Sequence, residues 1–204
     1  MGNCRFCYPL NRRNNSLVLT ESKNFYVMAS AGPIIEGYVL ICSKKHISSC
    51  ANIPNEVYSE YSELKELIKN LFFKKYGGYT FFEHGKTKLC AQNGSDNHCF
   101  HAHLHALPTK ADILPKLIKE LGQPIEVSNK EEVLKATENN PYLYYETYKG
   151  CFVWKATGDL RQQFFRWILA EELGALDKAD WKENPNWDVA IETVKKLKTN
   201  FVGL

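Results

Sequence analysis

Three histidines at alternate positions, in the run His101-Ala102-His103-Leu104-His105, form the most reactive grouping in the sequence. Side chains of an extended strand point alternately to its two faces, so the histidines would form a row on one face. A neutral imidazole near pH 7 can attack an electrophile, move a proton or bind a metal ion. The alternative is an accidental polar face or an incidental metal-binding stripe, but buried imidazoles need partners for their ring nitrogens. The spacing therefore favours a site that performs chemistry.

The N-terminal segment holds a second grouping, Cys4-Arg5-Phe6-Cys7, which has the close cysteine spacing of a zinc knuckle. A redox dithiol would stand at the start of a helix that follows a strand, and no strand is expected before Cys4. Chance occurrence of free thiols remains the alternative. The sequence has seven cysteines, and an odd number without an export signal argues against a disulfide framework. We therefore expect free or metal-bound thiols.

Short apolar and aromatic runs predict the strands that would carry these residues, and their ranges are 16–19, 25–29, 37–43, 79–83 and 99–107. A helix is expected from Asn55 to Lys75, because apolar residues recur there at three- and four-residue steps and Gly77 follows. The polar stretch between the last two strands is expected to be a loop. The first half of the chain is thus predicted to combine a sheet with one long helix.

The sequence from Thr109 onward has a different pattern. It predicts helices over 112–121, 129–137, 159–173 and 187–200, and a hairpin formed by 142–145 and 150–154. Ser128 and Asp159 are the expected N-caps of the second and third of these helices. No linker separates this half from the first, so we expect the two halves to pack together.

The histidine row, followed by the apolar pair Ala106-Leu107, resembles the signature of the histidine-triad (HIT) family. The run 37–43, which leads to Lys45-His46, is similar to the upstream strand of that family, and the helix and polar loop follow in the family's order. The resemblance covers about the first half of the chain. It implies an α+β, HIT-like fold with a meandering antiparallel sheet and a packed helix. Residues 1–110 would form the catalytic domain, and 111–204 a mainly helical C-terminal extension packed on it.

The same resemblance implies a nucleotide hydrolase that acts on the α-phosphate of a dinucleoside polyphosphate, a phosphoramidate or a similar nucleotide. His103 would attack phosphorus and form a covalent nucleotidyl-histidine intermediate, which water then resolves. His105 would orient His103 or stabilise its charged intermediate. The polar loop would offer backbone N–H groups and amides to phosphate oxygens. The loop residues expected to bind substrate are Asn93, Gly94, Ser95, Asn97 and His98.

The resemblance also implies a role for the cysteine pair. In zinc-containing relatives, and in the similar galactose-1-phosphate uridylyltransferases, the remaining ligands are the histidine that ends the upstream strand and the first histidine of the triad. A closed and therefore structural zinc site is thus expected from Cys4, Cys7, His46 and His101.

Several alternatives stay open at this point. The same intermediate would serve a nucleotidyltransferase, and a zinc-stabilised nucleotide-binding module with little turnover is a different class of function. His84, in Glu83-His84-Gly85, could donate a proton or contact substrate, but a surface-loop histidine is the favoured interpretation. Arg161-Gln162-Gln163 and Arg166 could contact phosphate through the bidentate arginine fork, although such residues more often cover the exposed side of a helix.

Composition limits the class of protein. The hydrophobic fraction of 44% and the charged fraction of 24% are those of a globular chain, and the net charge of +3 is too small for a polybasic nucleic-acid surface. No apolar run approaches the roughly 20 residues that span a bilayer. We therefore expect a cytoplasmic protein whose partner is a small-molecule nucleotide, with no membrane association and no stable nucleic-acid partner. A homodimer is possible, unless the extension covers the surface through which HIT proteins pair.

Overall fold

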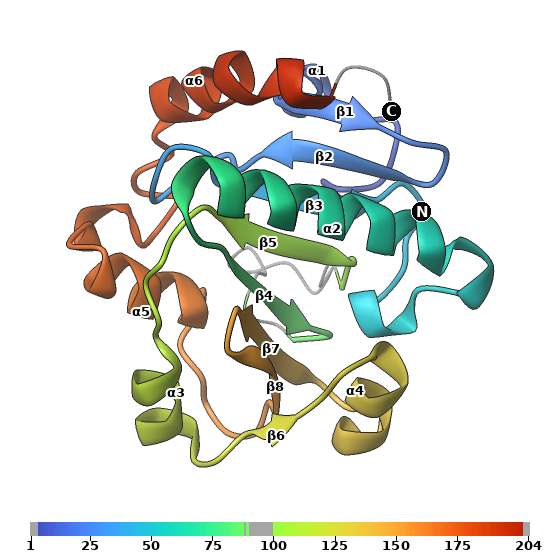
Figure 1. Cartoon of the computed structure of the whole chain (residues 1–204), viewed down its shortest axis with the longest axis vertical. Helices are drawn as coiled ribbons and strands as arrows, with labels where there is room; N and C mark the ends of the chain where they lie inside the picture. The colour runs from blue at the N-terminus through green and yellow to red at the C-terminus, as the bar shows by residue number, and fades with distance from the viewer. Residues whose placement is uncertain (1–3, 88, 90–99, 202–204) are drawn as a thin grey trace.

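One antiparallel sheet runs through the structure, a computed structural model that describes residues 4–87, 89 and 100–201 (Figure 1). Its strands are β1 (Val18–Glu21), β2 (Phe25–Ala29), β3 (Val39–Ser43), β4 (Thr80–Gly85), β5 (His103–Leu107), β6 (Ile125–Glu126), β7 (Tyr142–Thr147) and β8 (Gly150–Lys155). They lie side by side in the order β1-β2-β3-β5-β4-β7-β8-β6. The predicted α+β class, with an antiparallel sheet and packed helices, is confirmed.

The helices connect and cover these strands. The α-helices within the described residues are α1 (Arg12–Asn15), α2 (Asn55–Tyr76), α3 (Leu114–Leu121), α4 (Lys130–Thr137), α5 (Phe164–Glu172) and α6 (Trp187–Leu197). Short 3-10 turns are η1 (Cys50–Asn52), η3 (Leu176–Lys178) and η4 (Lys198–Phe201). None of the described helices is both long and apolar enough to cross a membrane.

The sheet places the histidine strand β5 at its centre, between β3 and β4, and every residue of β5 is buried. Cys42 pairs with His103, and both Leu40 and Phe82 pair with His105. Directly paired residues share a face of a sheet. His103 and His105 therefore lie with these three side chains on one face, which we call the triad face.

The other face is covered by α2, which lies in front of β3 and β5 in Figure 1, and we call it the helix face. Leu104 and Glu83 point to this side and lie near Tyr61 of the helix. The predicted helix from Asn55 is confirmed, and it ends where Gly77 adopts a positive φ of 76°.

The C-terminal half extends the same sheet. The hairpin formed by β7 and β8 pairs onto β4 through β7, with Phe82 opposite Tyr145. On the triad face, the ring of Phe165 from α5 contacts the ring of Phe82, with centroids 5.1 Å apart. Strands and helices from residues beyond 110 thus contact the centre of the first half directly.

Two of the expected N-caps are wrong. Asn129, not Ser128, caps α4, because its side chain accepts a hydrogen bond from the backbone of Glu132 while Ser128 donates its backbone N–H to the carboxylate of Glu132. With Asp159 as its N-cap, helix α5 would begin at residue 160. It begins at Phe164 instead, and its N-cap is Gln163. The side chain of Gln163 is turned instead toward Asp180, at 2.7 Å.

The strand that was predicted over 99–107 begins at His103 in the structure. His101 precedes the strand, and its position is fixed by neighbouring backbone contacts. Ala102 donates to the carbonyl of Ile47 at 2.6 Å and accepts from the backbone N–H of Ser43 at 3.2 Å. The histidine row therefore begins at His101, two residues before the first residue of β5.

Candidate active site and metal site

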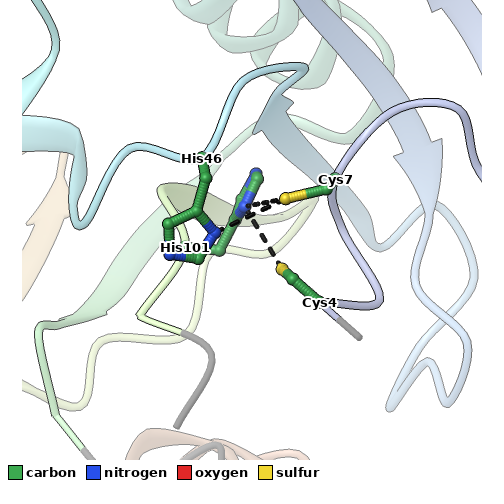
Figure 2. A group of neighbouring side chains, drawn as sticks. All are labelled: Cys4, Cys7, His46 and His101. Atoms are coloured by element: carbon green, nitrogen blue, oxygen red, sulfur yellow. Dashed lines mark hydrogen bonds between the residues drawn. The ribbon is translucent and has the colours of Figure 1, made fainter. Parts of the chain in front are cut away.

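Four side chains from three separate segments, including the first histidine of the row, lie close together (Figure 2). Cys4 and Cys7 come from the N-terminal segment, His46 from the loop after β3, and His101 from the segment before β5. Their sulfur and nitrogen atoms all lie within 4.8 Å of one another. The four residues that the cysteine spacing and the family resemblance linked to zinc are thus brought together.

The distances within this cluster fit a tetrahedral metal site. Zinc–sulfur and zinc–nitrogen bonds of about 2.3 and 2.0 Å at a tetrahedral angle would place sulfur and nitrogen about 3.5 Å apart. Cys4 Sγ lies 3.4 Å from His101 Nδ1, and Cys7 Sγ lies 3.4 Å from His46 Nδ1 and 3.7 Å from His101 Nδ1. Two thiols and two imidazoles are also the donor set of many structural zinc sites.

Ser43 fixes the orientation of the His101 ring. The Nε2–H of His101 donates to the carbonyl of Ser43 at 2.7 Å, and the hydroxyl of Ser43 lies 3.1 Å from the same nitrogen. A proton on Nε2 leaves the lone pair of the neutral ring on Nδ1, which faces the two cysteines. Metal-binding histidines are oriented in this way by their second nitrogen.

The oxidation state of the thiols bears on metal binding. Cys7 is a free thiol, as expected, whereas Cys4 is disulfide-bonded in this structure, so the expectation of a free or metal-bound thiol is wrong for Cys4. A cysteine binds zinc as the thiolate. The full set of four ligands therefore belongs to the reduced protein.

His103 is held in the form that a nucleophile needs. Its Nδ1–H donates to the carbonyl of His101 at 2.6 Å, so Nε2 carries the lone pair. Its ring stacks on Phe6 with centroids 4.6 Å apart. Burial lowers the pKa of His103 to about 4, although the hydrogen bond to His101 opposes the shift. The ring is therefore neutral at pH 7, and a neutral imidazole is the nucleophilic form.

His105 lies next along the row, buried under aromatic side chains. Its Nδ1 is 2.6 Å from the hydroxyl of Tyr38, and its ring stacks on Phe82 at 4.3 Å. The rings of His103 and His105 meet edge to face at 4.9 Å. Nε2 of His105 is buried and has no hydrogen-bond partner in the described part of the protein. Burial lowers the pKa of His105 well below its usual value.

His84 is not the surface-loop histidine that was favoured from the sequence. Strand β4 continues through Gly85, and His84 lies two residues after Phe82 on the triad face, where it is buried. Its Nε2 accepts the backbone N–H of Phe165 at 3.3 Å, and its ring lies 6.2 Å from that of His105. Burial lowers its pKa to about 3. Strand periodicity, extended by two residues, would have found this fourth histidine.

A cavity opens along the row, and we call it the triad cavity. Both halves of the chain form its walls, since Gln163, Arg166 and Trp181 belong to the C-terminal half. Its lining residues are Arg5, Phe6, Ser30, Ala31, Gly32, Leu40, His84, His103, His105, Gln163, Arg166 and Trp181.

Arg166 projects from α5 into the wall of this cavity and does not cover an exposed helix side. Its Nε–H donates to the carbonyl of Ala179 at 3.0 Å. Its Nη2 donates to the carbonyls of Gly32 and Lys178 at 2.7 and 2.9 Å. The guanidinium therefore joins the loop after β2 to the segment that follows η3.

Family assignment rests on the sequence match. Proteins similar to the CwfJ C-terminal region share a family pattern that matches residues 1–118, which is more than half of the 204 residues. The chain belongs to this CwfJ C-terminal family. The match includes all four residues of the metal cluster and the whole histidine row.

Curated relatives of this CwfJ-family chain are distant. A zinc finger CCCH domain-containing protein of Oryza sativa subsp. japonica is 24% identical over 97% of this chain and 34% of its own length. A CWF19-like protein of Xenopus laevis is 26% identical over 89% of this chain and 34% of its own length. The chain thus spans about a third of the length of these curated relatives.

Solved structures similar to the CwfJ-family chain include a HIT family hydrolase from Clostridium thermocellum. It is 21% identical, with a TM-score of 0.41, and the match covers 57% of this chain and 98% of that one. A yeast Ap4A phosphorylase in complex with AMP is 11% identical, also with a TM-score of 0.41, over 74% of this chain and 63% of that one.

The expected phosphate-binding loop lies outside the described residues of the CwfJ-family chain. This applies to Asn93, Gly94, Ser95, Asn97 and His98. Their role as substrate-binding residues stays a prediction. The described part of the site therefore consists of the metal cluster, the histidine row and the walls of the triad cavity.

Proposed function

We propose that this chain is a histidine-triad nucleotide hydrolase in which Nε2 of His103 attacks the α-phosphorus of a nucleotide. The state of the His103 ring carries the proposal. The ring is neutral, its Nδ1–H is engaged by the carbonyl of His101, and it lines the triad cavity. A neutral imidazole with a free lone pair is a good nucleophile for phosphorus and afterwards a good leaving group.

The reaction divides into two displacements. The Nε2 lone pair of His103 forms a bond to phosphorus while the bond to the leaving oxygen breaks, and the leaving group takes that electron pair. The ring becomes cationic, and the carbonyl of His101 stabilises the charge through the hydrogen bond from Nδ1. Water then attacks phosphorus and loses a proton to solvent. The electrons of the N–P bond return to His103, which releases the nucleoside monophosphate.

His105 acts beside the nucleophile in this proposal. Its ring restrains that of His103 through the edge-to-face contact, and Tyr38 fixes its own orientation through Nδ1. Because Tyr38 restrains the ring of His105, that ring can in turn keep the ring of His103 in a single geometry, which favours in-line attack. His105 is therefore assigned as a positioning residue.

Zinc is proposed as the metal of the cluster formed by Cys4, Cys7, His46 and His101. The cluster's donor set and spacing support this choice. Four protein ligands would leave no open position, so the metal would be structural and take no part in the reaction. It would anchor the turn that carries Phe6, whose ring stacks on His103. The metal would thus stabilise the geometry of the nucleophile.

A nucleotide-binding module with little turnover is the second candidate. The observation in its favour is that His103 is only 5% exposed, with Phe6 stacked on its ring. A nucleotidyltransferase would use the same intermediate and differ only in the acceptor.

Turnover by matched variants separates these candidates. The purified chain is incubated with dinucleoside polyphosphates, nucleoside phosphoramidates and nucleotide sugars, and released nucleoside monophosphate is measured. We expect hydrolysis by the wild type, loss of about a thousandfold or more in His103→Ala, and unchanged rates in Lys69→Gln on the exposed side of α2. Equal rates in the wild type and folded His103→Ala would reject the nucleophile. Nucleotide binding without turnover in the wild type would favour the binding module.

A further inference from the structure

Arg166 is a buried cation that no carboxylate pairs within the described residues. The side chain is 3% exposed. None of the ion pairs found among residues 4–87, 89 and 100–201 includes it. An arginine is always charged in a protein, and burying an unpaired charge is costly. A bound anion would offset part of that cost.

The hydrogen bonds of Arg166 leave part of the guanidinium unused. A guanidinium has five N–H donors. The Nε donor and the two Nη2 donors are used by the carbonyls of Ala179, Gly32 and Lys178. The two Nη1 donors make no hydrogen bond to a described residue. They belong to a side chain that lines the triad cavity.

No carboxylate forms an ion pair with Arg166 within the described residues. Asp180 is the nearby acid, but its Oδ1 accepts hydrogen bonds from the side chain of Gln163 at 2.7 Å and from the backbone N–H of Lys182 at 2.9 Å, not from Arg166. The groups that face Arg166 across the cavity are His84 and His105, whose pKa values are lowered chiefly by burial and further by this positive charge. The residues that line the triad cavity include Arg5 and Arg166 and no acidic side chain, so its lining is cationic at neutral pH.

The guanidinium is also held rigidly before any ligand arrives. One of its carbonyl partners, Gly32, packs so closely on Trp181 that a Cβ at position 32 would lie 2.3 Å from the Cβ of Trp181. The others, Lys178 and Ala179, precede that tryptophan in the chain. A cation fixed from two walls loses little conformational freedom on binding, which raises its affinity for an anion.

We propose that Arg166 is a substrate-binding residue whose Nη1 donors hold a phosphate group of the nucleotide in the triad cavity. This inference rests on the proposed function for the identity of the ligand. It assigns to the C-terminal half a direct part in binding and makes a phosphate-bearing nucleotide, in preference to a nucleoside, the class of ligand. The competing explanation is that Arg166 only joins the loop after β2 to the segment after η3.

Calorimetric titration with adenosine monophosphate and with adenosine tests the inference. The titrations use the reduced full chain carrying His103→Ala, so that no covalent adduct can form. Into this background we introduce Arg166→Gln, Arg166→Lys and the control Arg161→Gln, which removes an exposed cation stacked on Trp167. Circular dichroism verifies that each variant is folded.

We expect Arg166→Gln to lower the affinity for adenosine monophosphate by about tenfold or more, because one charge-assisted interaction is lost. The affinity for adenosine should change little. Arg166→Lys should lose part of that affinity, since it retains the charge without the fork. Arg161→Gln should bind as the parent does. Equal losses for both ligands, or none, in a folded Arg166→Gln protein would overturn the proposal.

A measurement on the wild type covers the case in which Arg166→Gln does not fold. The Nε–H resonance of Arg166, assigned through Arg166→Lys, is followed by NMR as adenosine monophosphate is added to the wild type. A saturable shift is expected, and its absence at saturation would overturn the proposal. Failure of the proposed function can be told apart from failure of this inference. If only the hydrolase function is wrong, the wild type shows no turnover, but binding of adenosine monophosphate still depends on Arg166.

Discussion

Buried polar side chains on the central strands have different partners on the two faces of the sheet. On the helix face, the carboxylate of Glu83 accepts from the backbone of Cys50 at 2.8 Å and from the hydroxyl of Tyr142 at 2.5 Å. Lys65 pairs with Glu146 at 2.5 Å on the same side. These groups have their partners within the protein, as buried polar groups normally do.

The triad face leaves comparable atoms without partners. Nε2 of His105 is buried and has no hydrogen bond within the described part of the chain. Two donors of Arg166 are likewise unused there. A buried polar atom without a partner costs free energy unless a ligand supplies one. The comparison suggests that the helix face stabilises the fold and that the triad face is prepared for an anion.

Removal of the metal should have the largest effect on this comparison, because the proposed zinc fixes the N-terminal wall of the triad cavity. Cys7→Ser should release about one zinc per chain and lower the free energy of unfolding by about 3 kcal/mol or more. Activity should fall by about tenfold or more as Phe6 loses its anchor. Metal analysis, urea unfolding and turnover under reducing conditions measure the three effects. Cys151→Ser, whose thiol lies on the helix face, is the control. Full zinc retention in Cys7→Ser would reject the ligand set.

Removal of a tyrosine hydroxyl on the triad face should affect activity more than the fold. Tyr38→Phe deletes the partner of His105 Nδ1 and should lower kcat by about tenfold, since the ring next to the nucleophile becomes less restrained. KM for the nucleotide should change little. Steady-state kinetics on the folded variant provide the test, and an unchanged kcat would remove His105 from its positioning role.

The matching deletion on the helix face should affect the fold and not the activity. Tyr142→Phe leaves Glu83 without its hydroxyl donor and the backbone N–H of Ala51 without its acceptor. The free energy of unfolding should fall by about 1–3 kcal/mol, because both groups stay buried. Urea unfolding measures the loss. A large fall in kcat with unchanged stability would contradict the division between the two faces.

Acid should destabilise the protein through the triad face. The folded pKa of His84 is about 3, below its ordinary value of 6.5, so the unfolded chain binds a proton that the folded chain does not. The stability that His84 contributes is therefore complete above pH 6.5 and is lost as the pH falls toward 3. The expected loss from this residue is about 1.4 kcal/mol between pH 7.5 and 5.5. Urea unfolding at both values should show a smaller loss in His84→Gln, and an equal loss would contradict this assignment.

Local sequence patterns predicted the strands and the long helix well. The alternation of His103, Leu104 and His105 gave the correct faces because strand geometry depends on neighbouring residues alone. Strand periodicity extended to Gly85 would have placed His84 on the face of Phe82, but its burial could not be read locally, since it arises from the pairing of β4 with β7 and from contact with Phe165. The N-cap errors have a similar origin, since the side chain of Gln163 is engaged by Asp180.

The composition of the site was only partly predictable. The cysteine spacing and the family resemblance selected four metal-binding candidates, and Cys4 and His101, which are 97 positions apart, do meet. The partners of Arg166 were invisible in the sequence, because they are backbone carbonyls from two loops and carry no side-chain signature. Contacts made by backbone atoms across a fold require the structure.

Mass spectrometry of the protein mixed rapidly with substrate tests the central claim most directly. The wild type should carry a nucleotidyl group that maps to His103 after acid-free digestion, and His103→Ala should carry none. A nucleotidyl group on another residue, or rapid turnover with no adduct at any time point, would contradict attack by His103.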